Sequence, residues 1–203
     1  MNIETIMRTA PVIPVLVTED VAHAAPIAAA LVAGGLRVLE VTLRTAAALE
    51  VIAEMAKVDG AIVGAGTVLN PADLDAALKA GAQFIVSPGL TDPLARAAIG
   101  SGIPFLPGTA NASDLMRGLD LGLDRFKFFP ATAAGGLPAL KALAAPFGNV
   151  RFCPTGGITE ATAPDWLAEE AVLCVGGSWI VPKGAPDAAL IRQRAAAAAA
   201  FSA

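Results

Sequence analysis

The sequence predicts a barrel of eight parallel strands, each followed by a helix, and three observations support this α/β fold class. Eight short runs rich in branched or aromatic residues recur along the chain, and their starts lie about 20 to 25 residues apart. Helical signals fill the intervals, which is the alternation typical of parallel strands with right-handed crossovers. The first run is not followed by G-x-G-x-x-G, the fingerprint of the competing open sheet. We therefore expect a (β/α)8 TIM barrel as a single domain over residues 1–203.

The predicted strands are short and apolar, as buried parallel strands are. They occupy residues 12–17, 37–43, 61–65, 84–87, 105–107, 125–129, 150–154 and 171–175. In such a barrel alternate side chains point inward, and functional groups gather at the carboxyl ends of the strands. Polar residues within or just after these runs are therefore the candidates for a site.

Start and stop signals mark the helices between the strands. Asn70 and Pro71 are expected to be the N-cap and first residue of one helix, which Gly81 ends. The other signals are Gly34 and Gly35 after the helix of residues 26–33, Thr45 at the start of the next helix, Ser113 as a cap and Gly122 as an end. The alanine-rich residues 194–203 are expected to complete the last helix, because alanine is the best helix former.

Composition excludes several classes of protein. The chain has 203 residues, 55% of them hydrophobic and 16% charged, and its formal net charge is −4. This is neither the composition of a disordered chain nor the basic surface that nucleic acid requires. No apolar run reaches the roughly 20 residues of a membrane span, and residues 1–10 lack the pattern of a secretory signal. We expect a cytoplasmic globular protein without nucleic-acid or membrane partners, whose apolar surplus hints at an oligomer.

Histidine and cysteine are scarce, which removes two kinds of chemistry. The chain has one histidine, His23, and two cysteines, Cys153 and Cys174. Catalytic zinc sites take about three such ligands, so we expect no metal site built on them. A Ser-His-Asp triad would have to use His23, which fits better as a polar residue in a first helical turn. Each cysteine lies in an apolar run, which favours a buried thiol over a disulfide or a nucleophile.

Two charged residues interrupt otherwise apolar strands. Glu40 lies in the second run and Lys127 in the sixth, so their side chains can share a layer of the barrel. A lone buried charge is costly and must find a partner or change its protonation state. A lysine kept neutral by desolvation condenses with ketones to a Schiff base, and a facing glutamate can supply acid–base catalysis. The alternatives are a purely structural ion pair or outward-pointing side chains.

Glycine clusters after the seventh and eighth runs indicate an anion site. They are Thr155-Gly156-Gly157 and Gly176-Gly177-Ser178. Glycines let backbone N–H groups approach an anion closely, and loops at these two places are a frequent phosphate site of the barrel fold. We therefore expect a phosphorylated ligand. A similar cluster over residues 64–67 ends in Thr67, whose register with Val63 and Ala65 predicts an inward side chain.

Eight segments of the chain form a set that is more specific than any one of them. They are PVIPVLV, VAGGLRVLEVTLRT, IVGAGTVLNP, AGAQFIVSPGLT, IPFLPGTA, LDRFKFFPA, VRFCPTGGIT and VLCVGGSWIVP. In this order and at this spacing they resemble the class I 2-keto-3-deoxy-6-phosphogluconate (KDPG) aldolases, a family that includes 4-hydroxy-2-oxoglutarate (KHG) aldolases. The resemblance covers nearly the whole chain. It implies a homotrimer that needs no cofactor and acts in the Entner–Doudoroff pathway.

The resemblance also implies roles for individual residues. The family's Schiff-base lysine matches Lys127, and its acid–base glutamate matches Glu40. The residues implied at the pyruvate end are Arg44, Thr67, Pro88 and Phe129, and those at the phosphate end are Thr155, Gly156, Gly157, Gly176, Gly177 and Ser178. Thr132 departs from the pattern, because some relatives carry a glutamate there, and the departure bears on substrate selectivity.

Together these features predict reversible retro-aldol cleavage of KDPG to pyruvate and glyceraldehyde 3-phosphate. The nearest alternatives are the same chemistry acting mainly on KHG or on the galactonate epimer of the substrate. A metal-dependent aldolase is disfavoured by the single histidine. A different class is a non-catalytic barrel that binds a phosphorylated ligand or serves as an assembly scaffold.

Overall fold

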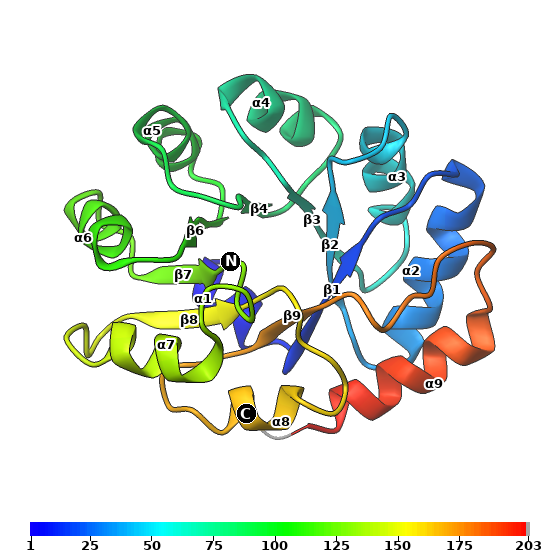
Figure 1. Ribbon diagram of the computed structural model, residues 1–203. Helices are drawn as coiled ribbons and strands as arrows, with labels where there is room; N and C mark the ends of the chain where they lie inside the picture. Colours follow the sequence, from blue (N-terminus) through cyan, green and yellow to red (C-terminus); the bar gives the residue numbers. More distant parts are fainter. Residues whose placement is uncertain (202–203) are drawn as a thin grey trace.

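Parallel strands form a ring at the centre of the computed structural model, which describes residues 1–201 (Figure 1). The strands within that range are β1 Val12–Leu16, β2 Val38–Thr42, β3 Ile62–Gly66, β4 Ile85–Val86, β5 Phe105–Leu106, β6 Gly108–Thr109, β7 Arg125–Phe128, β8 Arg151–Pro154 and β9 Val175–Gly177. Their hydrogen-bonded order is β5-β4-β3-β2-β1-β9 and β6-β7-β8. Pro107 separates β5 from β6, which share one strand position, and a bridge from Thr155 to Gly176 links β8 to β9. The result is the predicted eight-position barrel.

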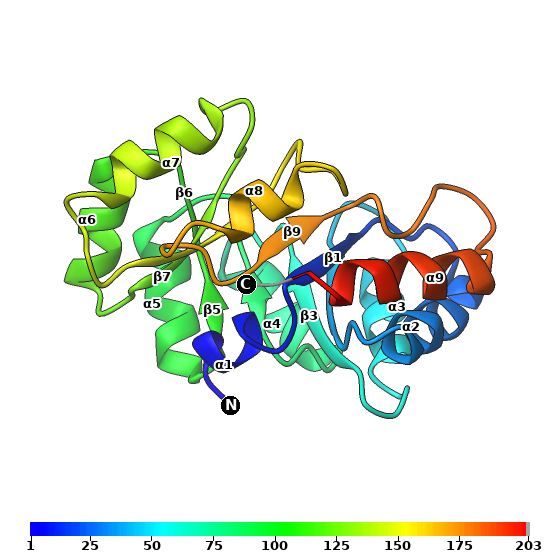
Figure 2. The ribbon, with the colours of Figure 1, turned by 90° about the horizontal axis from the view of Figure 1, so that it is seen from below.

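Helices surround the strands as an outer layer (Figures 1 and 2). They are α2 Ala24–Ala33, α3 Ala48–Met55, α4 Pro71–Lys79, α5 Asp92–Ser101, α6 Ala112–Asp120, α7 Gly136–Ala144, α8 Ala163–Leu167 and α9 Ala188–Ala199, and a short 3-10 helix, η1 Val21–His23, precedes α2. In the part of the chain that the structure describes, no helix is both long and apolar enough to cross a membrane.

The helix signals are confirmed in some places and wrong in others. Asn70 caps α4, since its side-chain oxygen accepts a hydrogen bond from the Asp73 N–H at 2.9 Å. Ser113 is not a cap, because Asn111 has the extended backbone that capping needs and accepts from the Asp114 N–H at 3.0 Å. Residues 202 and 203 of the predicted last helix lie outside the described residues.

Thr45 does not begin a helix, and α3 starts three residues later at Ala48. The Thr45 hydroxyl instead donates a hydrogen bond of 2.8 Å to the carbonyl of Thr18. That bond ties the loop after β2 to the loop after β1. The side chain therefore organises the carboxyl ends of the strands, where the candidate site lies.

The last strand is displaced from its predicted place at residues 171–175. β9 begins at Val175 and includes both glycines that were expected to form the following turn. Its register against β1 pairs Val12 with Val175 and Ile13 with Gly176. A side chain at Gly176 would collide with the Thr155 hydroxyl, so the glycine lets β8 and β9 lie close together.

Side chains alternate between the two faces of the strands. The inward face forms an apolar cluster of Ile13, Val38, Ile62, Phe84, Val86, Leu106, Cys153, Leu173 and Cys174, and the outward face packs against the helices. Val63 and Ala65 belong to the outward cluster, so their predicted inward register is wrong. The reason is that β3 pairs Gly64 with Glu40, which sets the even-numbered residues of β3 inward.

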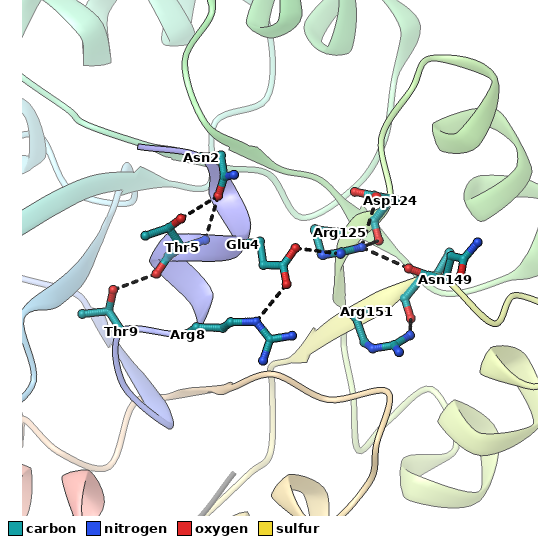
Figure 3. Close-up of polar contacts among 10 residues, drawn as sticks. Asn2, Glu4, Thr5, Arg8, Thr9, Asp124, Arg125, Asn149 and Arg151 are labelled. Carbon is teal, nitrogen blue, oxygen red and sulfur yellow. Dashed lines mark hydrogen bonds and ion pairs between the residues drawn. The ribbon is translucent and has the colours of Figure 1, made fainter.

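A short helix that the sequence patterns did not predict, α1 Ile3–Met7, closes the amino end of the barrel. Its Ile6 and Met7 are almost fully buried against the inward cluster. Glu4 accepts hydrogen bonds of 2.8 Å from Arg8 and from Arg125, which begins β7 (Figure 3). These contacts anchor the helix to the barrel floor.

We expect the Glu4 contacts to stabilise the fold only above acidic pH. The Arg8 hydrogen bond, followed by the Arg125 hydrogen bond and charge, holds the pKa of Glu4 below its usual value of 4.5. A lowered folded-state pKa stabilises the protein above the unfolded-state pKa, and this contribution is lost as pH falls through the folded-state pKa. Glu4→Gln should therefore lower the unfolding temperature at about pH 7 and lower it by less at about pH 3. Glu160→Gln, at an exposed position, is the control. An equal effect of Glu4→Gln at both pH values would contradict the assignment.

Candidate active site

Two charged residues are buried among the described residues, and they face each other across the barrel. Glu40 on β2 is 3% exposed and Lys127 on β7 is 5% exposed. Lys127 Nζ lies 3.1 Å from Glu40 Oε1, close enough for an ion pair with a hydrogen bond. Both side chains point inward, so the outward-facing alternative is wrong.

The local sequence explains why Lys127 points inward. Its neighbours Phe126 and Phe128 both belong to the outward cluster, and the Phe128 ring packs against Trp166 of α8 at a centroid distance of 6.4 Å. Two large aromatic side chains anchored outside the barrel leave the alternate position to face inside. The outward packing of Phe126 and Phe128 thus fixes the inward direction of Lys127 between them.

Phe129 and Pro88 lie next to the lysine. Lys127 Nζ is 5.2 Å from the centroid of the half-buried Phe129 ring, which is cation–π distance. Pro88 packs against Gly108, the residue that pairs with Lys127 in the ladder between β6 and β7. A side chain at Gly108 would collide with the Pro88 carbonyl group. The structure therefore places the Phe129 ring beside the lysine and the Pro88 carbonyl beside the lysine's ladder partner.

Arg44 and Thr67 lie on adjoining loops. A hydrogen bond of 2.8 Å from the Leu43 N–H to the Gly66 carbonyl joins the loop after β2 to the end of β3. Arg44 is exposed, and within residues 1–201 its guanidinium has no hydrogen-bond or ion-pair partner. Thr67 has a φ of 60°, which is unusual for a β-branched residue. This left-handed residue follows directly after β3, so the strand alternation from which its inward direction was predicted ends at Gly66.

The two glycine clusters meet at the carboxyl ends of β8 and β9. Thr155 bridges to Gly176, and Gly156 and Gly157 both have positive φ, at 103° and 78°. Ser178 is exposed just after β9. The Trp179 ring fills the space beside Gly177. The predicted phosphate residues therefore lie together at the carboxyl ends of β8 and β9, where the Thr155 N–H and hydroxyl already donate to the carbonyls of Phe128 and Cys153.

Two buried thiols border the ion pair, a neighbourhood that the sequence patterns did not predict. Cys153 pairs with Lys127 in the ladder between β7 and β8, and its Sγ is 3.8 Å from Thr155 Oγ1. A hydrogen bond with Cys153, burial and the nearby charge of Glu40 raise the pKa of the Cys174 thiol well above its usual value. Both cysteines are free and buried, as expected. The alternation of side chains along the strands, which turns both cysteines inward, was the sequence signal that could have predicted this neighbourhood.

The described residues contain no cluster of three or more His, Cys, Asp or Glu side chains arranged to hold a metal ion.

Comparisons with known proteins agree on one family. Residues 3–194 match the family model for KDPG and KHG aldolases. The chain is 62% identical over 200 residues to the 2-dehydro-3-deoxy-phosphogluconate aldolase of Zymomonas mobilis, an alignment that covers 98% of this chain and 96% of the relative.

Solved structures of similar proteins share the fold. A crystal structure of the Zymomonas mobilis enzyme with 3-phosphoglycerate superposes with a TM-score of 0.97 and covers 98% of this chain and 96% of its own. The KDPG aldolase of Legionella pneumophila, 44% identical, superposes with a TM-score of 0.95 over 98% of this chain and 99% of its own. That structure holds pyruvate as a covalent carbinolamine intermediate.

The φ of Thr67 predicts an unusual response to mutation. A left-handed conformation at a β-branched residue costs about 1–3 kcal/mol, whereas introducing glycine costs roughly 0.5–1 kcal/mol of chain entropy. Thr67→Gly should therefore raise the free energy of unfolding by about 1 kcal/mol in urea titrations. Thr67→Ala keeps the Cβ atom and serves as the matched control without this gain. Equal stability of the two variants would show that the strain is absent.

Proposed function

The chain belongs to the KDPG and KHG aldolase family, and from that premise we propose that Lys127 and Glu40 are the catalytic pair of a Schiff-base aldolase. The enzyme is a lyase that cleaves KDPG reversibly to pyruvate and glyceraldehyde 3-phosphate. The observation that carries the residue assignment is the 3.1 Å contact between the two buried charges of the described chain.

The first half of the reaction forms the imine. Glu40 accepts a proton from the Lys127 ammonium, and the neutral amine attacks the C2 ketone of the substrate to give a carbinolamine. Glu40 then protonates the carbinolamine hydroxyl, which leaves as water, and the protonated imine remains on Lys127. Lys127 Nζ and Glu40 Oε1 lie 3.1 Å apart, which allows the ammonium proton to pass directly from the lysine to the carboxylate.

The second half breaks the carbon–carbon bond. Glu40 removes the proton of the C4 hydroxyl, the C3–C4 electron pair moves into the imine, and glyceraldehyde 3-phosphate leaves. The enamine that remains on Lys127 takes up a proton at C3, and water hydrolyses the resulting imine to release pyruvate. One carboxyl group therefore serves as both acid and base within a single turnover.

We assign the pyruvate end of the substrate to Arg44, Thr67, Pro88 and Phe129. The exposed guanidinium of Arg44 can hold a carboxylate through two parallel hydrogen bonds. Phe129 and Pro88 supply apolar walls beside the lysine. We assign the phosphate to the neighbourhood of Thr155, Gly156, Gly157, Gly176, Gly177 and Ser178. Gly156 and Gly157 have positive φ, and the missing side chains let the backbone N–H groups of this turn approach an anion closely.

The oligomer, location and pathway remain part of the proposal. We propose the homotrimer of the family, an oligomer that rests on the family membership of the chain. The two free thiols suit a reducing cytoplasm. The substrate would place the enzyme in the Entner–Doudoroff pathway, and a single domain over residues 1–203 would carry the whole activity.

Trapping the imine tests the assignment of Lys127. Pyruvate and borohydride together should attach one reduced pyruvyl group to Lys127, detected by mass spectrometry of the peptide, with loss of activity. Lys141→Ala, which removes an exposed lysine of α7, should label fully, and Lys127→Ala should not label. Labelling that survives Lys127→Ala would sink the assignment.

Turnover of three substrates tests the phosphate neighbourhood and the preferred substrate. We expect kcat/KM to be highest for KDPG, lower for its galactonate epimer and lowest for KHG, which has no phosphate. Ser178→Ala should lower kcat/KM for both phosphorylated substrates by about tenfold, the loss of a hydrogen bond to a charged group, and leave KHG turnover unchanged. An equal loss on all three substrates would show that Ser178 does not bind phosphate.

A further inference from the structure

The carboxyl group of Glu40 occupies the space where a side chain at Gly66 would be. Gly66 ends β3, is buried and lies next to β2. A Cβ atom built on it would collide with Glu40 Oε1 and would lie 2.7 Å from Glu40 Cγ and 2.8 Å from Glu40 Cδ. The three nearest atoms thus all belong to the proposed acid–base residue. From this contact we infer that Gly66 is a positioning residue for Glu40, an inference that rests on the proposed function.

Strand register shows how Glu40 reaches this place. On the ladder between β2 and β3, Glu40 pairs with Gly64, whereas Gly66 pairs with Thr42. The Glu40 side chain therefore leans two residues toward the carboxyl ends of the strands. This lean brings its Oε1 atom to 3.1 Å from Lys127 Nζ. The contact between Glu40 and Lys127, on which the proposed proton transfer depends, therefore requires that Gly66 has no side chain.

An aromatic ring closes the other direction. A Cβ atom at Gly64 would lie 2.5 Å from three atoms of the Phe84 ring, so that ring fills the space directly opposite Glu40. The carboxyl group cannot swing back over Gly64 without displacing the buried Phe84. Different groups therefore fill the spaces beside the two glycines of β3. The Phe84 ring lies beside Gly64, and the Glu40 carboxyl group lies beside Gly66.

The same contrast predicts what a methyl group would do at each position. At Gly66 the colliding atoms are the end of a flexible side chain, so Gly66→Ala should fold with a displaced Glu40 carboxyl group. At Gly64 they belong to a ring packed in the core, so Gly64→Ala should chiefly destabilise the fold. The backbone of β3 is held in the ladder and cannot retreat.

A thermal-stability cycle tests the contact without reference to catalysis. Unfolding temperatures are measured for wild type, Gly66→Ala, Glu40→Ala and the double variant. Truncation of Glu40 removes the colliding atoms, so Gly66→Ala should lower the unfolding temperature in the wild-type background and have no effect in the Glu40→Ala background. Equal, additive losses in both backgrounds would overturn the inference, whatever Glu40 does in catalysis.

Kinetics test the positioning role. A misplacement of about 1 Å can cost 10²-fold, so Gly66→Ala should lower kcat about 10²-fold while KM changes little. Exchange of the pyruvate methyl hydrogens with D2O, followed by NMR, should slow in parallel, because it requires the same base. Gly100→Ala, at an exposed position of α5 where an added Cβ atom meets nothing within 4 Å, is the control and should retain this exchange in full. An unchanged kcat in Gly66→Ala would overturn the inference.

The variant Glu40→Asp distinguishes two explanations for a loss of activity in Gly66→Ala: displacement of the Glu40 carboxyl group and general damage to the barrel. In Glu40→Asp the carboxyl group is withdrawn from Gly66, so adding Gly66→Ala to that background should cost far less in kcat than it costs in wild type. A full loss in both backgrounds would contradict positioning through Glu40. Full activity of Glu40→Gln would instead refute the proposed function, and the stability cycle would still report on the contact itself.

Discussion

The buried pair of Glu40 and Lys127 is the interaction around which the interior of this barrel is arranged. Neither charge could remain in an apolar core without the other, because removing one partner leaves an uncompensated charge at a cost of about 3–5 kcal/mol. The pair also exists only because both side chains face inward, on β2 and β7. Phe126 and Phe128 secure this orientation from outside the barrel, so an outer packing contact sets the inner chemistry.

The carboxyl ends of the strands carry the polar groups, and close strand contacts bring them together. At each close contact a glycine leaves room for a group of a neighbouring strand or loop. The Glu40 side chain lies beside Gly66, the Pro88 carbonyl beside Gly108 and the Thr155 hydroxyl beside Gly176. A substrate with a carboxylate at one end and a phosphate at the other would span these approaches. The glycines of the sequence are therefore spacers within the sheet as well as turn residues.

Sequence reasoning could predict what depends on alternation and could not predict what depends on contacts between strands. Charges within apolar runs identified Glu40 and Lys127, because burial of a charge is costly wherever it occurs. The register of Val63 and Ala65 was wrong, because an apolar run does not show which of its faces turns inward. Gly66 was seen only as part of a cluster, since its partner lies on another strand. The helix α1 was missed because five residues gain their stability from the barrel floor rather than from intrinsic propensity.

The closed floor blocks the amino end of the barrel. With Ile6 and Met7 packed against the inward cluster, a substrate of the proposed reaction would approach Lys127 from the loops after the strands. In the proposed mechanism pyruvate stays covalently bound to Lys127 after the carbon–carbon bond breaks, so the phosphorylated aldehyde would leave first and, in the synthetic direction, would arrive last. The floor helix would not set this order, but it would set the side of the barrel from which both fragments come and go.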